Sequence, residues 1–146
     1  MHRKYFIKTC GLICIGGAAL SALLESCSSS LYYAQYKISE NKLTVKKSEF
    51  TEIKSEKIKQ RKFVLLKTEK LAFPVCIFKH NENLFTALYM ECTHRGCELK
   101  TNGSFIVCPC HGSEFTNAGV VQNPPADKNL KQFLTTIDDE NIYILL

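Results

Sequence analysis

The chain has 146 residues, enough for one domain, and it contains no visible internal repeat. Apolar residues make up 45% of it, the usual share for a globular protein with a modest core. The net charge of the chain is +5, and the net charge of residues 27–146 alone is +3. The sequence contains no stripe of basic residues interleaved with aromatic residues. A charge this small, without such a stripe, argues against a nucleic-acid-binding protein.

Residues 1–26 predict an export signal. Positive charge at Arg3, Lys4 and Lys8 precedes an apolar stretch over residues 9–24, an order typical of such signals. The stretch is 16 residues long, shorter than the ~20 apolar residues of a membrane-spanning helix. The domain is therefore expected outside the cytoplasm, close to a membrane.

Two features of this segment concern how the protein is exported and held. The Ser-Cys-Ser-Ser-Ser run over residues 26–30 is similar to a bacterial lipoprotein junction, with Cys27 as the lipidated residue. Residues 3–8 resemble a twin-arginine export motif in which lysine replaces the second arginine. An uncleaved N-terminal anchor stays open as the alternative. A lipid on Cys27 and a retained anchor would each tether the domain to a bacterial membrane, facing the periplasm or the cell exterior.

Beyond residue 30 the pattern favours short strands, and helical periodicity is scarce. Tight polar connections over residues 39–41, 80–83 and 138–141 predict hairpins. The expected strands are residues 31–38, 42–46, 62–67, 73–79, 84–90, 104–107, 133–137 and 142–146.

Two stretches depart from this pattern. Residues 54–62 are rich in lysine and contain one apolar residue, Ile58, which is typical of a solvated strand or loop; a docking patch for a partner is the alternative. Residues 91–131 are rich in glycine, proline, cysteine and asparagine and lack periodicity. We interpret them as binding loops inserted between the strands of an antiparallel, all-β scaffold.

Two short motifs stand within those loops, C-T-H-R-G-C at residues 92–97 and C-P-C-H-G-S at residues 108–113. In an extended loop, residues two apart point to one side, so Cys92 and His94 can face a common metal centre. Proline and glycine in the second motif favour a tight turn, which brings its first cysteine and its histidine together. Thiolate and imidazole are ligands for iron–sulfur centres, for iron and for zinc.

The two motifs closely resemble the signature of the Rieske iron–sulfur family, C-T-H-x-G-C followed by C-P-C-H-G-S. The resemblance implies an all-β, Rieske-like antiparallel sandwich or barrel over residues 27–146, with cluster-binding loops over residues 91–126. It implies one [2Fe–2S] cluster, in which two histidines replace two cysteines on one iron, and one-electron transfer as the chemistry. The ligands that it implies are Cys92, His94, Cys108 and His111.

The resemblance also implies roles for other residues of the motifs. In the respiratory and photosynthetic members a disulfide joins the counterparts of Cys97 and Cys110, whereas the small ferredoxins of ring-hydroxylating oxygenases lack it. Such a bridge needs an oxidising compartment, which agrees with the export signal. Ser113 is expected to donate a hydrogen bond to a bridging sulfide.

Cys76 lies outside the motifs, in an apolar strand, and is expected to be a buried, inert thiol.

Two positions differ from the quinol-oxidising members of the family. Where high-potential members carry a tyrosine that donates to a ligand sulfur, this chain has Phe115, so a lower midpoint potential is expected. Where those members carry an apolar residue that docks on cytochrome b, this chain has Arg95, which favours a different partner. A solvated arginine without a partner is the alternative. The Pro-Pro-Ala run at residues 124–126 matches the proline-rich third loop of the family.

Other functions can be weighed against the same residues. A structural zinc site would use the same four ligands, but it accounts neither for the two remaining cysteines of the motifs nor for the export signal. A Rieske oxygenase needs a second iron held by two histidines and a carboxylate, and outside the signal only His80 is left for it. No substrate-transforming site is therefore expected.

The expected role is that of a respiratory or quinol-linked electron-transfer subunit, with redox proteins such as a cytochrome as partners. The alternative is the small Rieske subunit of a periplasmic oxidoreductase of the arsenite-oxidase type.

Overall fold

The computed structural model describes residues 31–54 and 57–146. The expected export signal over residues 1–26 and the expected lipid site at Cys27 lie outside the described residues, so both stay predictions. Within the described part of the chain, no helix is long and apolar enough to cross a membrane.

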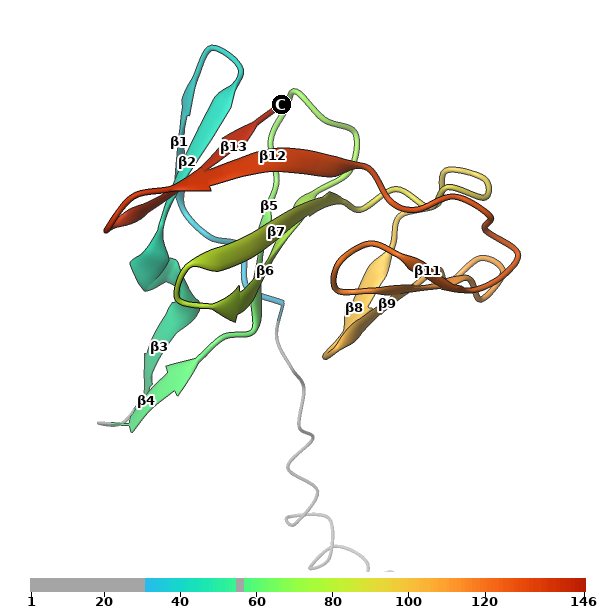
Figure 1. Ribbon diagram of the computed structural model, residues 1–146, viewed down its shortest axis with the longest axis horizontal. Helices are drawn as coiled ribbons and strands as arrows, with labels where there is room; N and C mark the ends of the chain where they lie inside the picture. Colours follow the sequence, from blue (N-terminus) through green and yellow to red (C-terminus); the bar gives the residue numbers. More distant parts are fainter. Residues whose placement is uncertain (1–30, 55–56) are drawn as a thin grey trace, which may run out of the picture. The chain divides into compact units, whose positions relative to one another are not determined.

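A seven-stranded antiparallel sheet forms the scaffold (Figure 1). Three hairpins with short polar turns supply six of its strands. In spatial order the strands are β1 (Tyr36–Ser39), β2 (Lys42–Lys46), β13 (Asn141–Leu145), β12 (Gln132–Ile137), β7 (Leu84–Tyr89), β6 (Val75–Asn81) and β5 (Phe63–Leu66).

Two smaller sheets complete the described fold. A single 3-10 turn, η2 (Lys47–Phe50), leads into a separate hairpin that pairs β3 (Thr51–Lys54) with β4 (Lys57–Gln60). A four-stranded antiparallel sheet carries the loops of the two motifs. Its strands in spatial order are β11 (Val121–Asn123), β10 (Glu114–Thr116), β9 (Phe105–Val107) and β8 (Lys100–Asn102).

Two hydrophobic cores stabilise the seven-stranded and the four-stranded sheets. On β2, Leu43 and Val45 are fully buried between exposed lysines, as expected for a strand with one face toward the interior. They belong to the first core, which is formed mainly by side chains of the seven-stranded sheet. In the second core, Leu88 of β7 packs with Ile106 of β9 and Phe115 of β10. This second core fixes the motif-bearing sheet against the scaffold.

The expected antiparallel, all-β scaffold is confirmed. The strands expected over residues 42–46 and 84–90 match β2 and β7 to within one residue, and all three expected hairpins form. The strand expected over residues 31–38 is shorter. Of these residues only 36–38 lie in β1, and Tyr33 meets Leu65 of β5 in an isolated parallel bridge at the other end of the sheet.

The two irregular stretches also contain strands. Of the residues described within 54–62, Lys54 ends β3 and Lys57–Gln60 form β4, so most of this stretch is strand. Within residues 91–131, β8, β10 and β11 were not expected. Each is three residues long, too short to show a period-two pattern in the sequence.

Candidate metal centre

The two motifs form loop 1 (residues 92–97) and loop 2 (residues 108–113), and both loops are closed by the same pattern of backbone hydrogen bonds. In loop 1, the N–H of Cys92 donates to the carbonyl of Cys97, and the N–H of Gly96 donates to the carbonyl of Cys92, each over 2.8 Å. In loop 2, the first cysteine makes the same two bonds, with the residues five and four positions later, over 2.8 and 3.0 Å. Each loop therefore closes on its own first cysteine.

A glycine with left-handed backbone makes each closure possible. Gly96 has a φ of +71° and Gly112 a φ of +79°, a region that costs other residues roughly 1–2 kcal/mol. A Cβ at position 112 would meet open space, whereas one at position 96 would lie 3.3 Å from the Glu91 carboxylate. The tight turn expected at Gly112 is therefore present. That Gly96 closes loop 1 in the same way was not predicted, because the histidine lies two residues after the first cysteine in one motif and three residues after it in the other.

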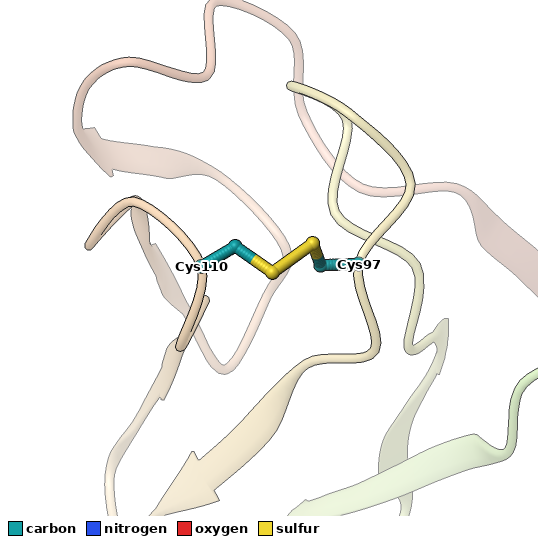
Figure 2. The surroundings of a disulfide bond; sticks show 2 residues. All are labelled: Cys97 and Cys110. Carbon is teal, nitrogen blue, oxygen red and sulfur yellow. A yellow bond between two sulfur atoms is a disulfide. The ribbon is translucent and has the colours of Figure 1, made fainter.

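A disulfide joins the two loops. Cys97 of loop 1 and Cys110 of loop 2 form an S–S bond of 2.05 Å across a Cα–Cα distance of 6.6 Å. Figure 2 shows the bond crossing from one loop to the other. The Cys108 sulfur lies within 4.8 Å of both bridged sulfurs. A disulfide offers no thiolate, so these three cysteines do not themselves form a metal site.

The first cysteine of each loop is free. Cys92 and Cys108 are 2% and 1% exposed, and neither takes part in a disulfide. Burial raises the pKa of the Cys92 thiol, and the adjacent Cys108 thiol raises it further, while the backbone N–H groups of His94 and Arg95 lower it. Amides that point at a sulfur stabilise its thiolate form, and a bound metal removes the thiol proton outright. Both positions therefore suit thiolate ligands.

The histidines of the two loops lie together. The ring centroids of His94 and His111 are 5.0 Å apart, and the ring planes are inclined by 82°. His111 is exposed, whereas His94 is partly buried. The Nδ1 atom of His94 is buried and has no hydrogen-bond partner among the described residues. Because a buried polar atom normally has a partner, this nitrogen is a candidate metal donor.

A third loop, which begins with the Pro-Pro-Ala run at residues 124–126, is bonded to both others. The N–H of Ala126 donates to the hydroxyl oxygen of Ser113 over 3.0 Å, and the hydroxyl of Thr93 donates to the carbonyl of Lys128 over 2.6 Å. Ser113 is fully buried, and because its oxygen accepts from Ala126, its hydrogen remains available to another acceptor. The proline run predicted this loop, but no sequence signal marks Thr93 or Lys128 as its contacts.

All three loops and the strands from β2 to β11 fall within one family model. The Rieske [2Fe-2S] domain matches residues 41–134, well over half of the chain, including both motifs and the proline run. The chain belongs to the Rieske family. This Rieske domain also has the fold expected of the family, a curled antiparallel sheet with a small loop-bearing sheet.

Similar proteins include iron-sulfur subunits of cytochrome b6-f complexes. This Rieske protein is 35% identical over 72 residues to the cytochrome b6-f complex iron-sulfur subunit of Chlorobaculum tepidum, which covers 48% of this chain and 39% of that protein. It is 40% identical over 53 residues to the same subunit of Trichodesmium erythraeum, covering 35% of this chain and 30% of that protein. The matched part is therefore less than half of these relatives.

Among solved structures, the cyanobacterial plasma membrane Rieske protein PetC3 from Synechocystis PCC 6803 is similar. It aligns with a TM-score of 0.51 and 31% identity, over 58% of this chain and 87% of that chain.

Family membership makes this chain a Rieske-type electron-transfer protein whose cofactor is a [2Fe–2S] cluster. The residues present fit that group. The two loops supply two buried thiols and two adjacent imidazoles, one of which has a buried nitrogen without a partner among the described residues. Ser113 supplies a hydroxyl with a hydrogen to donate. The family's cofactor favours the cluster over zinc, which the same side chains would also satisfy.

Proposed function

We propose that Cys92 and Cys108 bind one iron of the cluster and that His94 and His111 bind the other. The observation that carries this assignment is the pair of imidazoles 5.0 Å apart, contributed by the same two loops that supply the buried free thiols. Each loop then gives one ligand to each iron. The Cys97–Cys110 bridge joins the loops and limits how far the two halves of the ligand set can separate.

When bound, the cluster supplies a centre that gains and loses one electron at a time. The residues of the chain set the conditions for that exchange. The second core surrounds the cysteine ligands with apolar side chains and keeps water from them. The exposed imidazole of His111 faces solvent, and it is the ligand that a redox partner can approach. The hydroxyl of Ser113 would be a hydrogen-bond donor to the bound cluster, whereas the phenyl ring of Phe115 cannot donate at all.

We place the domain on the outer side of a bacterial membrane, held by its N-terminal segment, either through a lipid on Cys27 or through a retained anchor. The disulfide supports this location, because such bonds persist in oxidising compartments. The names of the similar proteins support it too, since one is a b6-f subunit and another a plasma membrane protein. A respiratory or quinol-linked chain would then supply the electrons, and a redox protein would accept them.

One observation favours a second role, that of the small Rieske subunit of a periplasmic oxidoreductase of the arsenite-oxidase type. Arg95 is exposed at the loop beside the proposed ligands and places a positive charge where a partner would dock. Purification from native membranes, with identification of the proteins that co-purify, distinguishes the two roles. A cytochrome b among them would support the quinol-linked chain, and a large catalytic subunit would support the alternative.

Electron paramagnetic resonance (EPR) of the reduced full chain tests the ligand assignment. The purified protein should be red-brown, and its reduced form should show a signal whose mean g value lies below that of an all-cysteine cluster. Cys108→Ala and His111→Ala should abolish this signal. Cys76→Ala is the matched control, because Cys76 is also free and buried but lies on β6 of the scaffold.

A signal that survives Cys108→Ala, or one that disappears in Cys76→Ala, would contradict the assignment. A colourless protein that contains zinc and gives no signal would contradict the iron–sulfur function itself.

A further inference from the structure

The β3–β4 hairpin projects from the seven-stranded sheet (Figure 1), and none of its described residues belongs to either hydrophobic core. β3 and β4 pair only with each other, and their register places Ile53 directly opposite Ile58. Their side chains are 76% and 72% exposed, the largest values among the large apolar residues of the described chain. Because cross-strand partners share a face, one face of the hairpin presents an apolar pair to solvent.

The other face of the hairpin carries positive charge. Lys54 lies opposite Lys57, a like-charge pairing that destabilises an isolated hairpin, and Lys59 lies opposite Glu52. Glu52 forms an ion pair with Arg61 at 3.8 Å, and among the described residues no acidic side chain pairs with any of the three lysines. The apolar pair and the like-charge pair are both unfavourable in water. Both become favourable at a surface that is anionic outside and apolar beneath.

The base of the hairpin lies beside the first described residues. The hydroxyl of Tyr32 donates to the Glu49 carboxylate, just before β3, over 2.8 Å. The ring of Tyr32 also lies 3.9 Å from the guanidinium of Arg61, just after β4. From Leu31 back to Cys27 an extended chain spans at most about 14 Å. A lipid on Cys27 would hold Leu31 within that distance of the bilayer, next to Tyr32, which contacts the residues at both ends of the hairpin. The strands of the hairpin, four residues each, reach about 13 Å.

We propose that the β3–β4 hairpin is a membrane-contact element for anionic lipid. Ile53 and Ile58 enter the interfacial layer, and the lysines extend their stems past the narrow ribbon so that their ammonium groups meet lipid phosphates. Each lysine near such a surface strengthens binding by about fivefold. This inference rests on the membrane tether of the proposed function. Figure 1 shows the hairpin and the four-stranded sheet on opposite sides of the scaffold, so the contact would leave loops 1 and 2 free for a redox partner.

Tryptophan fluorescence tests the contact, because the chain contains no tryptophan of its own. Ile53→Trp and Ile58→Trp are made in the full chain, which is reconstituted into phosphatidylcholine vesicles with or without phosphatidylglycerol. With phosphatidylglycerol, the emission should move to shorter wavelength and be quenched by brominated lipid. Leu134→Trp on β12 is the control, since Leu134 is also an exposed apolar residue and should keep the emission of a solvated indole.

A charge variant separates lipid contact from apolar contact alone. In the Ile58→Trp chain, replacing Lys54, Lys57 and Lys59 by glutamine should weaken the contact by roughly a hundredfold, from about fivefold for each lysine. The matched control removes the same charge elsewhere on the surface, by glutamine at Lys37, Lys46 and Lys100, and should leave the emission shift unchanged.

Vesicle flotation and the EPR signal of the cluster are recorded on the same samples. If the protein floats and carries its cluster but Ile53→Trp emits as in water, the hairpin proposal is overturned and the proposed function stands. Equal quenching of Leu134→Trp, or the same loss of shift in both lysine variants, overturns it as well. A protein that does not float overturns both the tether and the hairpin contact.

Discussion

Ala126 and Ser113 are joined by a hydrogen bond of 3.0 Å, in which the backbone N–H of Ala126 donates to the Ser113 hydroxyl oxygen. This bond attaches the third loop to the last residue of loop 2. The hydroxyl therefore supports the backbone through its oxygen, while its hydrogen is free to reach the proposed cluster. The two roles affect different measurements.

Ser113→Ala should change both stability and potential. Leaving the Ala126 N–H without an acceptor should lower the free energy of unfolding of the cluster-free protein by about 1–3 kcal/mol. Loss of a hydrogen bond worth about 1–2 kcal/mol to the reduced cluster should lower the midpoint potential by about 40–90 mV in a redox titration. Ser104→Ala, at an exposed position between β8 and β9, should change neither. An unchanged potential in Ser113→Ala would mean that the hydroxyl is only structural.

Phe115→Tyr should raise the midpoint potential. Phe115 is fully buried on β10, in the same core as Cys92 and Cys108, where a phenol could donate to a ligand sulfur. One added hydrogen bond of about 1–2 kcal/mol corresponds to a rise of about 40–90 mV. Phe105→Tyr on β9 is the control with the same chemical change. A cluster-loaded Phe115→Tyr protein with the original potential would refute this explanation of the residue.

Gly112→Ala should disturb the metal centre, whereas Gly103→Ala should not. Both glycines have positive φ, +79° and +66°, and a Cβ would meet open space at each. Each substitution should therefore lower the free energy of unfolding by a similar amount, about 1–2 kcal/mol. Only Gly112 closes a ligand loop, so only its variant should lose iron, as measured by metal content per chain. Equal iron retention in the two variants would contradict the role of the Gly112 turn in holding the ligands of loop 2.

Removing the disulfide should loosen both loops. The bridge spans 13 positions, and closing a loop of this length is worth about 3 kcal/mol in the unfolded chain. The double variant Cys97→Ala/Cys110→Ala should lose about that much unfolding free energy, measured by denaturant titration without reductant. It should also release iron faster than the parent protein. Cluster loss at the parental rate would show that the bridge does not hold the ligand set.

The turn between β12 and β13 should give the protein an acid-sensitive stability. Asp138 accepts hydrogen bonds from the Tyr143 hydroxyl and from the N–H groups of Asn141 and Glu140, and they lower its pKa from 3.8 to about 2. The folded form thus binds the proton less readily than the unfolded chain. Its stabilisation is complete above about pH 4 and is lost as the pH falls through about 2.

Asp138→Asn should therefore lower the denaturant midpoint of the cluster-free protein at neutral pH, and the difference should shrink on acidification. Asp139→Asn, one position along the same turn, is the control. A deficit in Asp138→Asn that stays constant from neutral to acid pH would contradict the assigned hydrogen bonds.

The candidate ligands could be proposed from sequence because both the residue types and their spacing carry the chemistry. Cys92 and His94 are two positions apart, and each motif brings its own extra cysteine. The pairing of those extra cysteines was implied by the family and is present in the structure. The strands of the scaffold were predictable from their burial: β2 and β13 bury alternate residues, whereas β6 and β7 bury four consecutive residues each and are nearly continuous apolar runs in the sequence.

The contacts that support the ligand loops were beyond sequence reasoning. Thr93 and Lys128 lie 35 positions apart, and a hydroxyl-to-carbonyl bond needs no particular residue at the carbonyl. The β3–β4 hairpin was ambiguous for a different reason. Its exposed apolar pair is formed across two strands, so Ile53 and Ile58 show no periodicity along either one.

The central claim is that two histidines and two cysteines of this chain hold one [2Fe–2S] cluster. Pulsed EPR of the reduced full chain, which detects nitrogen nuclei bound to the iron, tests it most directly. We predict two inequivalent, strongly coupled nitrogens, and the loss of that spectrum in both His94→Ala and His111→Ala. A reduced cluster that shows no strongly coupled nitrogen, or that keeps both couplings in either variant, would contradict the account.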